Sequence, residues 1–397
     1  MHLIIVSPFP PTITGIGQYG YYVTRALANS GAFSRVTVLA GSQLNGERPN
    51  HLGTTEIEYC WQPGQLNARQ AILSRVKRLN PDLVWFNLRV GMFGESPWLS
   101  VSGLLAPMFT HQMGYPTIVT FHELVELSDF RQLDAPGGPF APMGARLITS
   151  LATQADVVCL TMKKHVTWFA GQRPRVDCIH IPHGAFNEPV LLDEHDSLEL
   201  LLFNMLAPFK GVELLLDAYP ELRSEYPHLR LTIAGVEHPR FPGYIQSIKN
   251  RFADLDGIRW MGEVPDEAVI ELFRHAKIII LAYAASTGSS SVLYRAATWG
   301  RAVVSSDLSE MRSLTQEGNF QVEFFKNGNA TSLRNAIRTL LASPDKRRAQ
   351  IQNNFQAIQN VRIEITCHRY LHAFNRALEK RKSSKRLSIP QIEIETA

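Results

Sequence analysis

The sequence lacks the features that mark several large classes of protein. Its most prominent apolar run, residues 276–285, is about half of the roughly 20 residues that a membrane-spanning helix needs, so no such helix is expected. The four cysteines are scattered without a C-x-x-C pair, which excludes a disulfide framework and a structural zinc site. A net charge of +4 is too small for a dedicated nucleic-acid binder. The first ten residues lack the basic region of a signal peptide, so a reducing cytoplasm is the expected location.

What is present is an alternation of short β-branched runs with longer helical patterns. In a chain of 397 residues, 45% of them hydrophobic, this alternation predicts parallel sheets covered by helices on both faces. The strands expected in the first half are Leu3–Val6, Val36–Ala40, Leu83–Phe86, Thr117–Phe121, Val157–Leu160 and Cys178–Ile181. Helices are expected between them, for example at 18–29 and 68–79.

The alternation restarts after a polar, acidic segment at 183–197, which we interpret as a linker. The strands expected in the second half are Leu198–Asn204, Leu229–Ala234, Ile258–Met261, Lys277–Ala282 and Ala302–Ser305. From residue 331 onward the pattern is almost entirely helical. We therefore predict an α/β protein with two consecutive domains of nearly equal size, 1–183 and 184–365.

The loop after the first strand carries Gly15, Gly17 and Gly20 in the letters of a G-x-G-x-x-G dinucleotide motif. Two features argue against a nicotinamide or flavin cofactor. Gly15 comes nine residues after Val6, and the second strand, 36–40, does not end in an acidic residue for the ribose. The remaining interpretation is a loop that brings bare amide groups to a helix N-terminus, where an anion binds. A tight turn before an ordinary helix is the alternative.

Histidines follow two of the strands expected in the first half. His122, beside Glu123, could hydrogen-bond a substrate hydroxyl or carry a proton, whereas a capped turn is the alternative. His180 and His183 have no carboxylate nearby in the sequence, which makes a metal site poor, and they are left unassigned. Gly184 is assigned to the crossover between the domains.

Two loops of the second half suit a diphosphate. Lys210 stands between the strand at 198–204 and the next helix, where its ammonium would add a point charge beside the helix donors. The loop 284–291 opens the helix expected at 292–299, and its small hydroxyl residues can cap that helix and let a phosphate approach the backbone. Both loops would converge on one anion; a surface lysine and a simple helix cap are the alternatives.

In order and spacing, these segments resemble a glycosyltransferase of the GT-B fold, from the family-4 group of retaining enzymes (glycosyl transferases group 1). The shared segments are the Gly-x-Gly loop, T-F-H-E at 120–123, I-P-H-G-A at 181–185, A-P-F-K-G at 207–211, L-T-I-A-G at 231–235, I-R-W-M-G-E-V-P at 258–265 and A-A-T-W-G-R-A-V-V-S-S-D at 296–307. The resemblance implies two Rossmann-like domains facing a cleft, with the donor on the C-terminal domain and the acceptor on the N-terminal one. Residues 366–397 would supply a helix that packs back on the first domain, and a tail.

The resemblance also implies roles for particular residues. Lys210 would stabilise the departing diphosphate, His122 would line the sugar-transfer site, and these two are the expected catalytic residues. Gly17 would border the diphosphate from the first domain, and the segment 261–264 would pass beside the base. The expected nucleotide-sugar-binding residues are Gly15, Gly17, Lys210, Gly262, Val264, Thr287, Gly288, Ser289, Ser290, Ser291 and Arg295. No metal and no cofactor is expected, because the family needs no essential metal and the sequence has no D-x-D motif.

Three positions depart from the family pattern. Thr287 and Arg295 stand where the family usually carries two glutamates, and an arginine cannot accept the ribose hydroxyl groups that the second glutamate binds. The usual arginine before the K-G step is also missing, since Met205 and Leu206 precede A-P-F-K-G. Our hypothesis is that Arg295 supplies the replacement cation. No carboxylate pair at glycosidase spacing is identifiable, so hydrolysis is not expected.

The leading hypothesis is a cytoplasmic enzyme that transfers a hexose, with retention, from UDP-glucose or UDP-galactose to a saccharide or lipid-linked acceptor. Envelope or extracellular polysaccharide synthesis is the expected setting, with no nucleic-acid partner. Peripheral contact of the basic tail at 380–386 with the inner membrane face is the minority interpretation. The alternatives are a degenerate GT-B protein that binds a sugar or a partner without turnover, and an epimerase, whose acid and base carboxylates are not identifiable.

Overall fold

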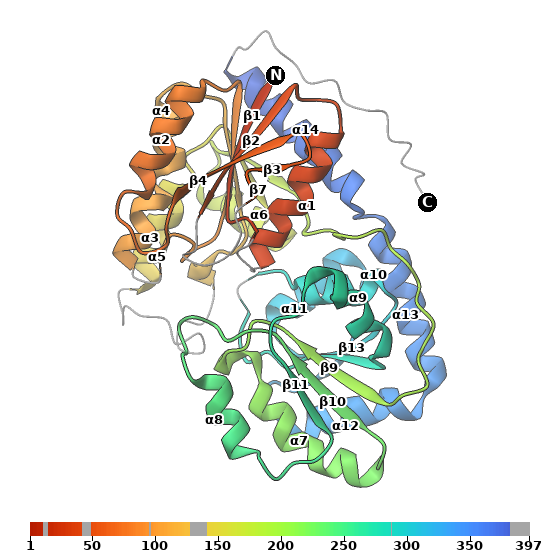
Figure 1. Ribbon diagram of the computed structural model, residues 1–397. Helices are drawn as coiled ribbons and strands as arrows, with labels where there is room; N and C mark the ends of the chain where they lie inside the picture. Colours follow the sequence, from red (N-terminus) through yellow and green to blue (C-terminus); the bar gives the residue numbers. More distant parts are fainter. Residues whose placement is uncertain (11–14, 42–48, 95–96, 128–140, 287, 382–397) are drawn as a thin grey trace. The chain divides into compact units, whose positions relative to one another are not determined.

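The computed structural model describes residues 1–10, 15–41, 49–94, 97–127, 141–286 and 288–381, which form two compact units (Figure 1). Within these residues, unit 1 comprises 1–127, 141–186 and 363–381, and unit 2 comprises 187–362. The sequence predicts boundaries after 183 and 365, whereas the units divide after Phe186 and the chain returns to unit 1 at Ile363. Phe186 stays with unit 1 because its ring stacks on Tyr22, with the ring centroids 5.1 Å apart.

A mostly parallel sheet forms the centre of unit 1. Its strands are β1 (His2–Ser7), β2 (Arg35–Gly41), β3 (His51–Leu52), β4 (Thr55–Trp61), β5 (Leu83–Leu88), β6 (Thr117–Phe121), β7 (Val157–Leu160) and β8 (Asp177–His180). Among the described residues they are ordered β3-β4-β2-β1-β5-β6-β7-β8, and only β3 runs antiparallel to its neighbour. The strands expected from the sequence are all found, within two residues at each end. The sequence does not predict β4, because Glu56 and Glu58 interrupt its apolar residues.

Side chains alternate between the two faces of this sheet, as the period of a strand requires. Leu3 and Ile5 belong to the core on one face, and Ile4 and Val6 to the core on the other. The first core is completed by helices α1 (Gly15–Asn29) and α14 (Ile363–Lys380). The second face is covered by α2 (Ala68–Leu79), α3 (Pro97–Leu104), α4 (Ala106–Gln112), α5 (Ala141–Ala152) and α6 (Lys163–Gln172).

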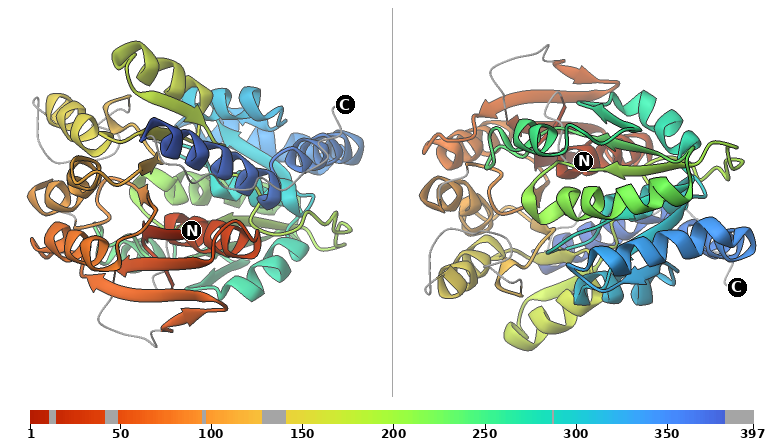
Figure 2. Two further views of the ribbon diagram at one scale, coloured as in Figure 1. Left: turned by 90° about the horizontal axis from the view of Figure 1, so that it is seen from above. Right: turned by 90° about the horizontal axis from the view of Figure 1, so that it is seen from below.

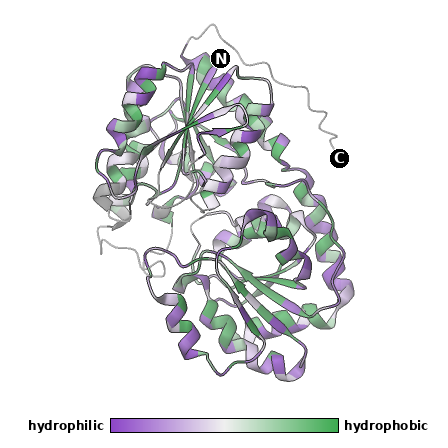
Figure 3. Cartoon of the chain, in the orientation of Figure 1, coloured by the Kyte–Doolittle hydropathy of each residue, from purple (hydrophilic) through white to green (hydrophobic). Residues whose placement is uncertain are grey.

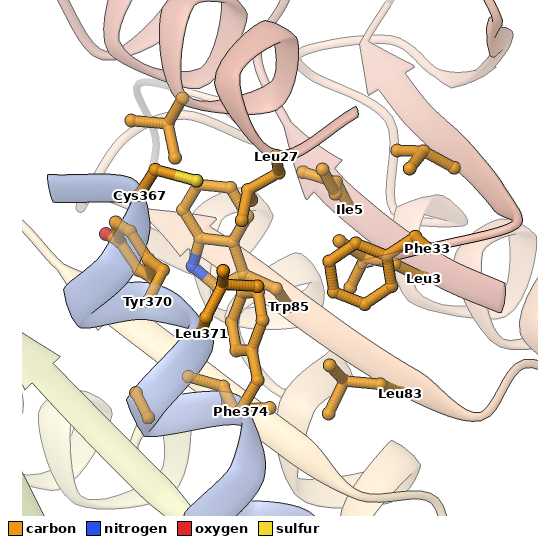
Figure 4. Packing of buried hydrophobic residues seen from close by; sticks show 14 of the residues in the cluster. Leu3, Ile5, Leu27, Phe33, Leu83, Trp85, Cys367, Tyr370, Leu371 and Phe374 are labelled. Carbon is orange, nitrogen blue, oxygen red and sulfur yellow. The ribbon is translucent and has the colours of Figure 1, made fainter. Parts of the chain in front are cut away.

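The last described helix, α14, packs on unit 1 beside α1 (Figure 2). Figure 4 shows Trp85 of β5 against Tyr370 and Phe374 of α14, with ring centroids 4.6 and 6.2 Å from that of Trp85. The buried Tyr370 hydroxyl also lies 2.8 Å from Thr120 Oγ1 and 2.6 Å from the hydroxyl of Tyr19. These apolar and polar contacts join a helix at the end of the sequence to the first helix and to two central strands.

Unit 2 is a six-stranded parallel sheet in its described residues, ordered β11-β10-β9-β12-β13-β14. The strands are β9 (Glu199–Phe203), β10 (Arg230–Ala234), β11 (Ile258–Met261), β12 (Ile278–Leu281), β13 (Ala302–Ser306) and β14 (Glu323–Phe325). The first five were expected, and β14 is too short to give a pattern in the sequence. Figure 3 shows the strands as the most hydrophobic part of the unit, which agrees with a sheet buried on both faces.

Helices cover both faces of this second sheet. Leu200 and Leu202 of β9 lie in the core formed with α7 (Val212–Glu225), α8 (Tyr244–Arg251), α12 (Ala330–Ala342) and α13 (Pro344–Gln359). On the opposite face, Phe203 contacts Phe273 of α9 (Asp266–His275), with ring centroids 5.8 Å apart. The remaining helices are α10 (Ser291–Thr298) and α11 (Ser309–Gly318).

Two further properties concern the described chain as a whole. None of its helices combines the length and the apolar character that crossing a bilayer demands. The four cysteines are free thiols.

Candidate functional site

The strand order of unit 2 reverses direction between β9 and β12, which are neighbours although three helices and two strands separate them in the chain. Ligands of open parallel sheets bind at such a switch point, beyond the carboxyl ends of the strands. The loop after β9 carries Lys210, and the loop after β12 carries the serine cluster, residues 288–291. The sheet therefore brings together the two loops that the sequence assigns to a diphosphate.

Lys210 ends a single 3₁₀ turn, Pro208–Lys210, that follows β9. The turn is held against β12, since the amide of Ala284 donates to the carbonyl of Phe209 at 2.9 Å. Gly211 then adopts a φ of 70°, and a Cβ at this position would overlap the carbonyl oxygen of Ala282. Only glycine meets both requirements without strain, so Gly211 fixes the place of Lys210 at the start of α7.

Tyr283 links the lysine to the serine cluster. The Lys210 ammonium lies 4.5 Å from the centroid of the Tyr283 ring, and the hydroxyl of that ring is 3.0 Å from Ser290 Oγ. The side chain of Asn204 also donates to the Tyr283 hydroxyl, at 3.0 Å. Burial raises the pKa of Tyr283, so its hydroxyl stays neutral and can hold both neighbours.

The serine cluster opens α10 as the sequence predicts. Ser290 is buried and is the N-cap, because its side chain accepts a hydrogen bond from the amide of Leu293. Gly288 is also buried, whereas Ser289 and Ser291 are partly exposed. The first amide groups of a helix have no partner within it and favour a negative charge. Thr287 lies outside the described residues.

Gly262 and Val264 follow β11, at the same edge of the sheet. Because β11 is two strands from β9, these two strands lie roughly 10 Å apart in the sheet. The amide of Gly235 donates to the carbonyls of Met261 and Gly262, at 3.1 and 3.0 Å, which ties the segment to the end of β10. The segment is thus ordered by backbone contacts, and its expected place beside a base stays a prediction.

Arg295 lies inside α10 and is buried, with 4% of its surface exposed. Its guanidinium donates to the carboxylate of Asp266 at 3.0 Å and lies 5.6 Å from the centroid of the Trp299 ring. Asp266 is the first residue of α9, two positions after Val264. The ion pair therefore joins the helix after the serine cluster to the helix after the β11 loop. A role of Arg295 as a cation at the diphosphate stays a prediction.

The switch point of unit 1 lies between β1 and β5. Gly15, which is exposed, and Gly17, which is buried, lie in the first turn of α1. The helix was expected from residue 18, so these glycines belong to the helix and not to the loop before it. The third glycine, Gly20, packs closely on the sheet, because a Cβ there would overlap the Ser7 hydroxyl and lie 3.1 Å from Asn87 Nδ2. Gly20 thus has the packing role of a third motif glycine, although the spacing argues against a dinucleotide.

His122, which follows β6, belongs to a chain of hydrogen bonds at this switch point. Its Nε2 lies 2.6 Å from Oδ1 of Asn87, whose Nδ2 donates to Ser7 Oγ at 2.9 Å and to the Ile16 carbonyl at 3.1 Å. The Ser7 hydroxyl in turn donates to the Pro8 carbonyl at 2.7 Å. The ends of β1 and β5 therefore hold His122 through Asn87.

Aromatic rings surround the imidazole of His122. The ring of Tyr19 meets it edge-on with centroids 4.7 Å apart, and His183, which the sequence left unassigned, lies 5.3 Å from Tyr19 and 4.8 Å from Phe186. Burial lowers the pKa of His122 to about 3, with smaller contributions from the nearby His183 and Arg89. His122 is therefore neutral near pH 7.

The sequence analysis missed Ser7, Asn87 and Tyr283. Each lies within two residues of the carboxyl end of a mostly apolar strand, and a polar residue at that position is the signal that could have found them. The described residues contain no group of three or more His, Cys, Asp or Glu side chains arranged to hold a metal ion. Metal-independent transfer stays a prediction.

Residues 199–343, within unit 2, match the family model of Glycosyl transferases group 1. Phosphatidyl-myo-inositol mannosyltransferase of Mycolicibacterium smegmatis is 28% identical over 151 residues, which cover 36% of this chain and 38% of that protein. A subunit of the phosphatidylinositol N-acetylglucosaminyltransferase of Homo sapiens is 22% identical over 269 residues, 66% of this chain and 52% of that protein. The chain thus spans between 38% and 52% of the length of these two curated relatives.

Solved structures resemble nearly the whole chain. Sucrose-phosphate synthase from Thermosynechococcus elongatus has a TM-score of 0.73 at 15% identity, covering 96% of this chain and 100% of that one. HepE of Anabaena, in complex with UDP-glucose, has a TM-score of 0.67 at 16% identity, covering 96% and 99%. The resemblance expected from the sequence is confirmed: residues 199–343 of unit 2 match the Glycosyl transferases group 1 model, and the chain has the GT-B fold.

Proposed function

We propose that the protein is a glycosyltransferase that moves a sugar from a nucleotide diphosphate bound by unit 2 to an acceptor hydroxyl. The observation that carries this proposal is the meeting of Lys210 with the serine cluster through Tyr283, at the switch point of a sheet whose family transfers sugars. A cation and two helix N-termini, those of α7 and α10, lie at this edge. That combination suits a diphosphate.

The chemistry needs stabilisation of the leaving group above all. As the bond from the sugar carbon to the diphosphate breaks, negative charge grows on the departing oxygen, and the ammonium of Lys210 and the amides of α10 would stabilise it. The bond to the acceptor oxygen forms on the same face of the sugar, so that the configuration is retained. The hydroxyl proton of the acceptor then passes to the departing diphosphate, which lies on that face.

The donor and acceptor are narrower parts of the proposal. A UDP-hexose, with glucose or galactose as the sugar, is supported by the UDP-glucose bound to the structurally similar HepE. The names of both curated relatives specify phosphatidylinositol, which favours a lipid-linked acceptor over a soluble saccharide. Their transferred sugars, mannose and N-acetylglucosamine, differ from each other, so relatives alone do not select the hexose. Polysaccharide synthesis at the cytoplasmic membrane face is the setting that we propose.

The test is nucleotide release from a panel of nucleotide sugars, with and without lipid-linked acceptors. We expect release from a UDP-hexose, without inhibition by EDTA, and a loss of roughly 10²- to 10³-fold in kcat for Lys210→Ala. Lys210→Arg, which keeps the charge, should lose less. Lys249→Ala is a matched control, because Lys249 lies on α8 against Trp260 and outside the candidate site.

A binding protein without turnover is the second candidate, and the ion pair of the buried Arg295 with Asp266 favours it. An arginine held by Asp266 occupies the position where the family usually carries a ribose-binding glutamate. Tight binding of a nucleotide sugar without release of the nucleotide, across the whole panel, would establish this candidate and reject the transferase.

A further inference from the structure

The hydrogen bonds of Asn87 determine the orientation of its amide. A backbone carbonyl can only accept, so the atom of Asn87 that faces the Ile16 carbonyl at 3.1 Å must be the NH₂ group. The same NH₂ group reaches Ser7 Oγ, whose own hydrogen is directed to the Pro8 carbonyl. Two independent acceptors therefore leave Oδ1 as the atom of Asn87 that faces His122.

The amide in turn determines the protonation of the histidine. Oδ1 of Asn87 can only accept, and it lies 2.6 Å from Nε2 of His122, so Nε2 carries the proton. In a neutral imidazole, the other nitrogen, Nδ1, then carries the lone pair. The His122 backbone is held separately, because its amide donates to the carbonyl of Leu88 at 3.1 Å.

The groups that face His122 come from three other elements. The ring of Tyr19 comes from α1, Arg89 follows β5, and His183 follows β8. Burial is the largest cause of the lowered pKa of His122, and the charges on Arg89 and His183 act in the same direction. The imidazole of His122 should therefore stay in one neutral form between pH 5 and 8.

We propose that Asn87 is a positioning residue that holds His122 in the neutral tautomer protonated at Nε2, so that Nδ1 accepts a hydrogen bond from a substrate hydroxyl group bound at unit 1. The tautomer itself follows from unit 1 alone, whereas the contact with a substrate hydroxyl group rests on the proposed function. The chemistry of this contact is selective. A hydroxyl can donate to Nδ1, but a phosphate or carboxylate oxygen without a proton cannot. His122 thus serves the uncharged part of the substrate.

The direct test is an NMR measurement of the histidine side-chain nitrogens in the full-length protein labelled with ¹⁵N. We expect Nε2 of His122 to behave as a protonated, pyrrole-type nitrogen and Nδ1 as a pyridine-type nitrogen, without change between pH 5 and 8. Assignment of the His122 signals uses their loss in His122→Gln. The opposite tautomer, a mixture of both, or an imidazolium at pH 6 would overturn the proposal. This readout does not depend on turnover, so it remains decisive even if no sugar is transferred.

Asn87→Asp converts the positioning group into a carboxylate. A carboxylate still accepts from Nε2 but also stabilises the imidazolium, so His122 should now titrate between pH 5 and 8. Asn204→Asp is the matched control, since it makes the same change at the end of β9 in unit 2 and should leave the His122 signals unchanged. A His122 that stays neutral in a folded Asn87→Asp protein would contradict the proposal.

The dependence of activity on pH, measured in Asn87→Asp and in the wild type, gives a kinetic test. Below its new pKa, His122 in Asn87→Asp loses the lone pair at Nδ1, so activity should fall about tenfold for each pH unit. The wild type should show no such acid limb. If Asn87→Asp does not fold, the tautomer measured in the wild type decides the proposal by itself.

Discussion

Unit 1 and unit 2 place their candidate residues at the same point of similar sheets, but they equip that point differently. In unit 1, the ends of β1 and β5 carry Ser7 and Asn87, which hold a neutral His122 in a chain of hydrogen bonds. In unit 2, the loop after β9 carries the cation of Lys210 beside the N-terminus of α10. The strand order of each sheet thus creates a binding position at its switch point, and the side chains there determine whether that position binds a hydroxyl group or an anion.

The two switch points also differ in what holds them in place. In unit 2, backbone contacts hold the Lys210 turn against the loop after β12, through Ala284 to Phe209 and the close approach of Gly211 to Ala282. The Tyr283 side chain adds the link to Ser290. The unit 1 point depends on side chains, with Gly20 leaving the space that Ser7 and Asn87 occupy. Changes at the two points should therefore disturb different properties of the protein.

The largest expected effect is that of acid on unit 1. The pKa of His122 is lowered from an ordinary value of 6.5 to about 3 in the folded protein, so between these values the unfolded chain binds more protons and stability falls as the pH falls. From pH 6.5 to 4 this one group contributes about 3 kcal/mol. His180, whose pKa burial lowers to about 4, acts in the same direction.

Hydrogen exchange, corrected for intrinsic rates, measures this effect for each unit separately. The acid-induced loss of protection should be smaller in His122→Gln than in the wild type, and the difference should be confined to peptides of unit 1. Equal losses in the two proteins would show that His122 is not held neutral by folding.

The next effect concerns the backbone of unit 2. Gly211→Ala should destabilise the unit by about 2–3 kcal/mol, because the alanine has a positive φ and its Cβ overlaps the carbonyl of Ala282. Gly243→Ala is the control: its φ is 84°, but no atom lies within 4 Å of the added Cβ, so only about 1 kcal/mol is expected. Urea unfolding followed by hydrogen exchange in unit 2 measures the loss of stability in both variants. Equal losses would show that the overlap with the Ala282 carbonyl does not destabilise Gly211→Ala.

A smaller loss, about 1–2 kcal/mol, is expected for Gly20→Ala in unit 1, where the added Cβ meets the side chains of Ser7 and Asn87. These side chains can shift, unlike a backbone carbonyl, but the shift should disturb the NMR signals of His122. Gly171→Ala in α6, where no atom lies within 4 Å, should instead stabilise the protein by about 0.5–1 kcal/mol. Unchanged NMR signals of His122 in Gly20→Ala would show that Gly20 does not support the hydrogen bonds that hold His122.

The smallest effect is expected at Arg295. Its guanidinium is already paired with Asp266, so Arg295→Ala should weaken the binding of a nucleoside diphosphate by no more than about tenfold, or about 1.4 kcal/mol. Isothermal titration of UDP measures the change. An Arg295→Ala protein with unchanged affinity would remove the idea that Arg295 replaces the missing cation.

Much of the fold could be predicted from the sequence, because buried parallel strands are continuous apolar runs between helices. The runs at β1, β6 and β12 gave their strands to within a residue or two. The strand β4 could not be predicted in this way. Its Glu56 is tolerated because Arg35 on the neighbouring β2 pairs with it at 2.7 Å, and that neighbour is not evident from periodicity.

The candidate site was predictable where it follows local rules. Ser290 is a helix N-cap that the run of small hydroxyl residues before the helix predicts. Lys210 lies in a strand-to-helix loop that can be recognised in the sequence. The bond between Asn87 and Ser7 joins residues 80 positions apart, and it exists only because β1 and β5 are neighbours in the sheet. Such pairings depend on strand order, which a single sequence does not reveal.

The most direct test of the division between the two switch points is the affinity of the full-length protein for UDP, measured by isothermal titration calorimetry in three forms. Lys210→Ala should bind UDP at least about tenfold more weakly than the wild type, since it loses the cation at the diphosphate. His122→Ala should bind it within about twofold of the wild type, because a neutral histidine in unit 1 has no role toward the diphosphate. A loss of UDP affinity in His122→Ala with full affinity in Lys210→Ala would contradict the account.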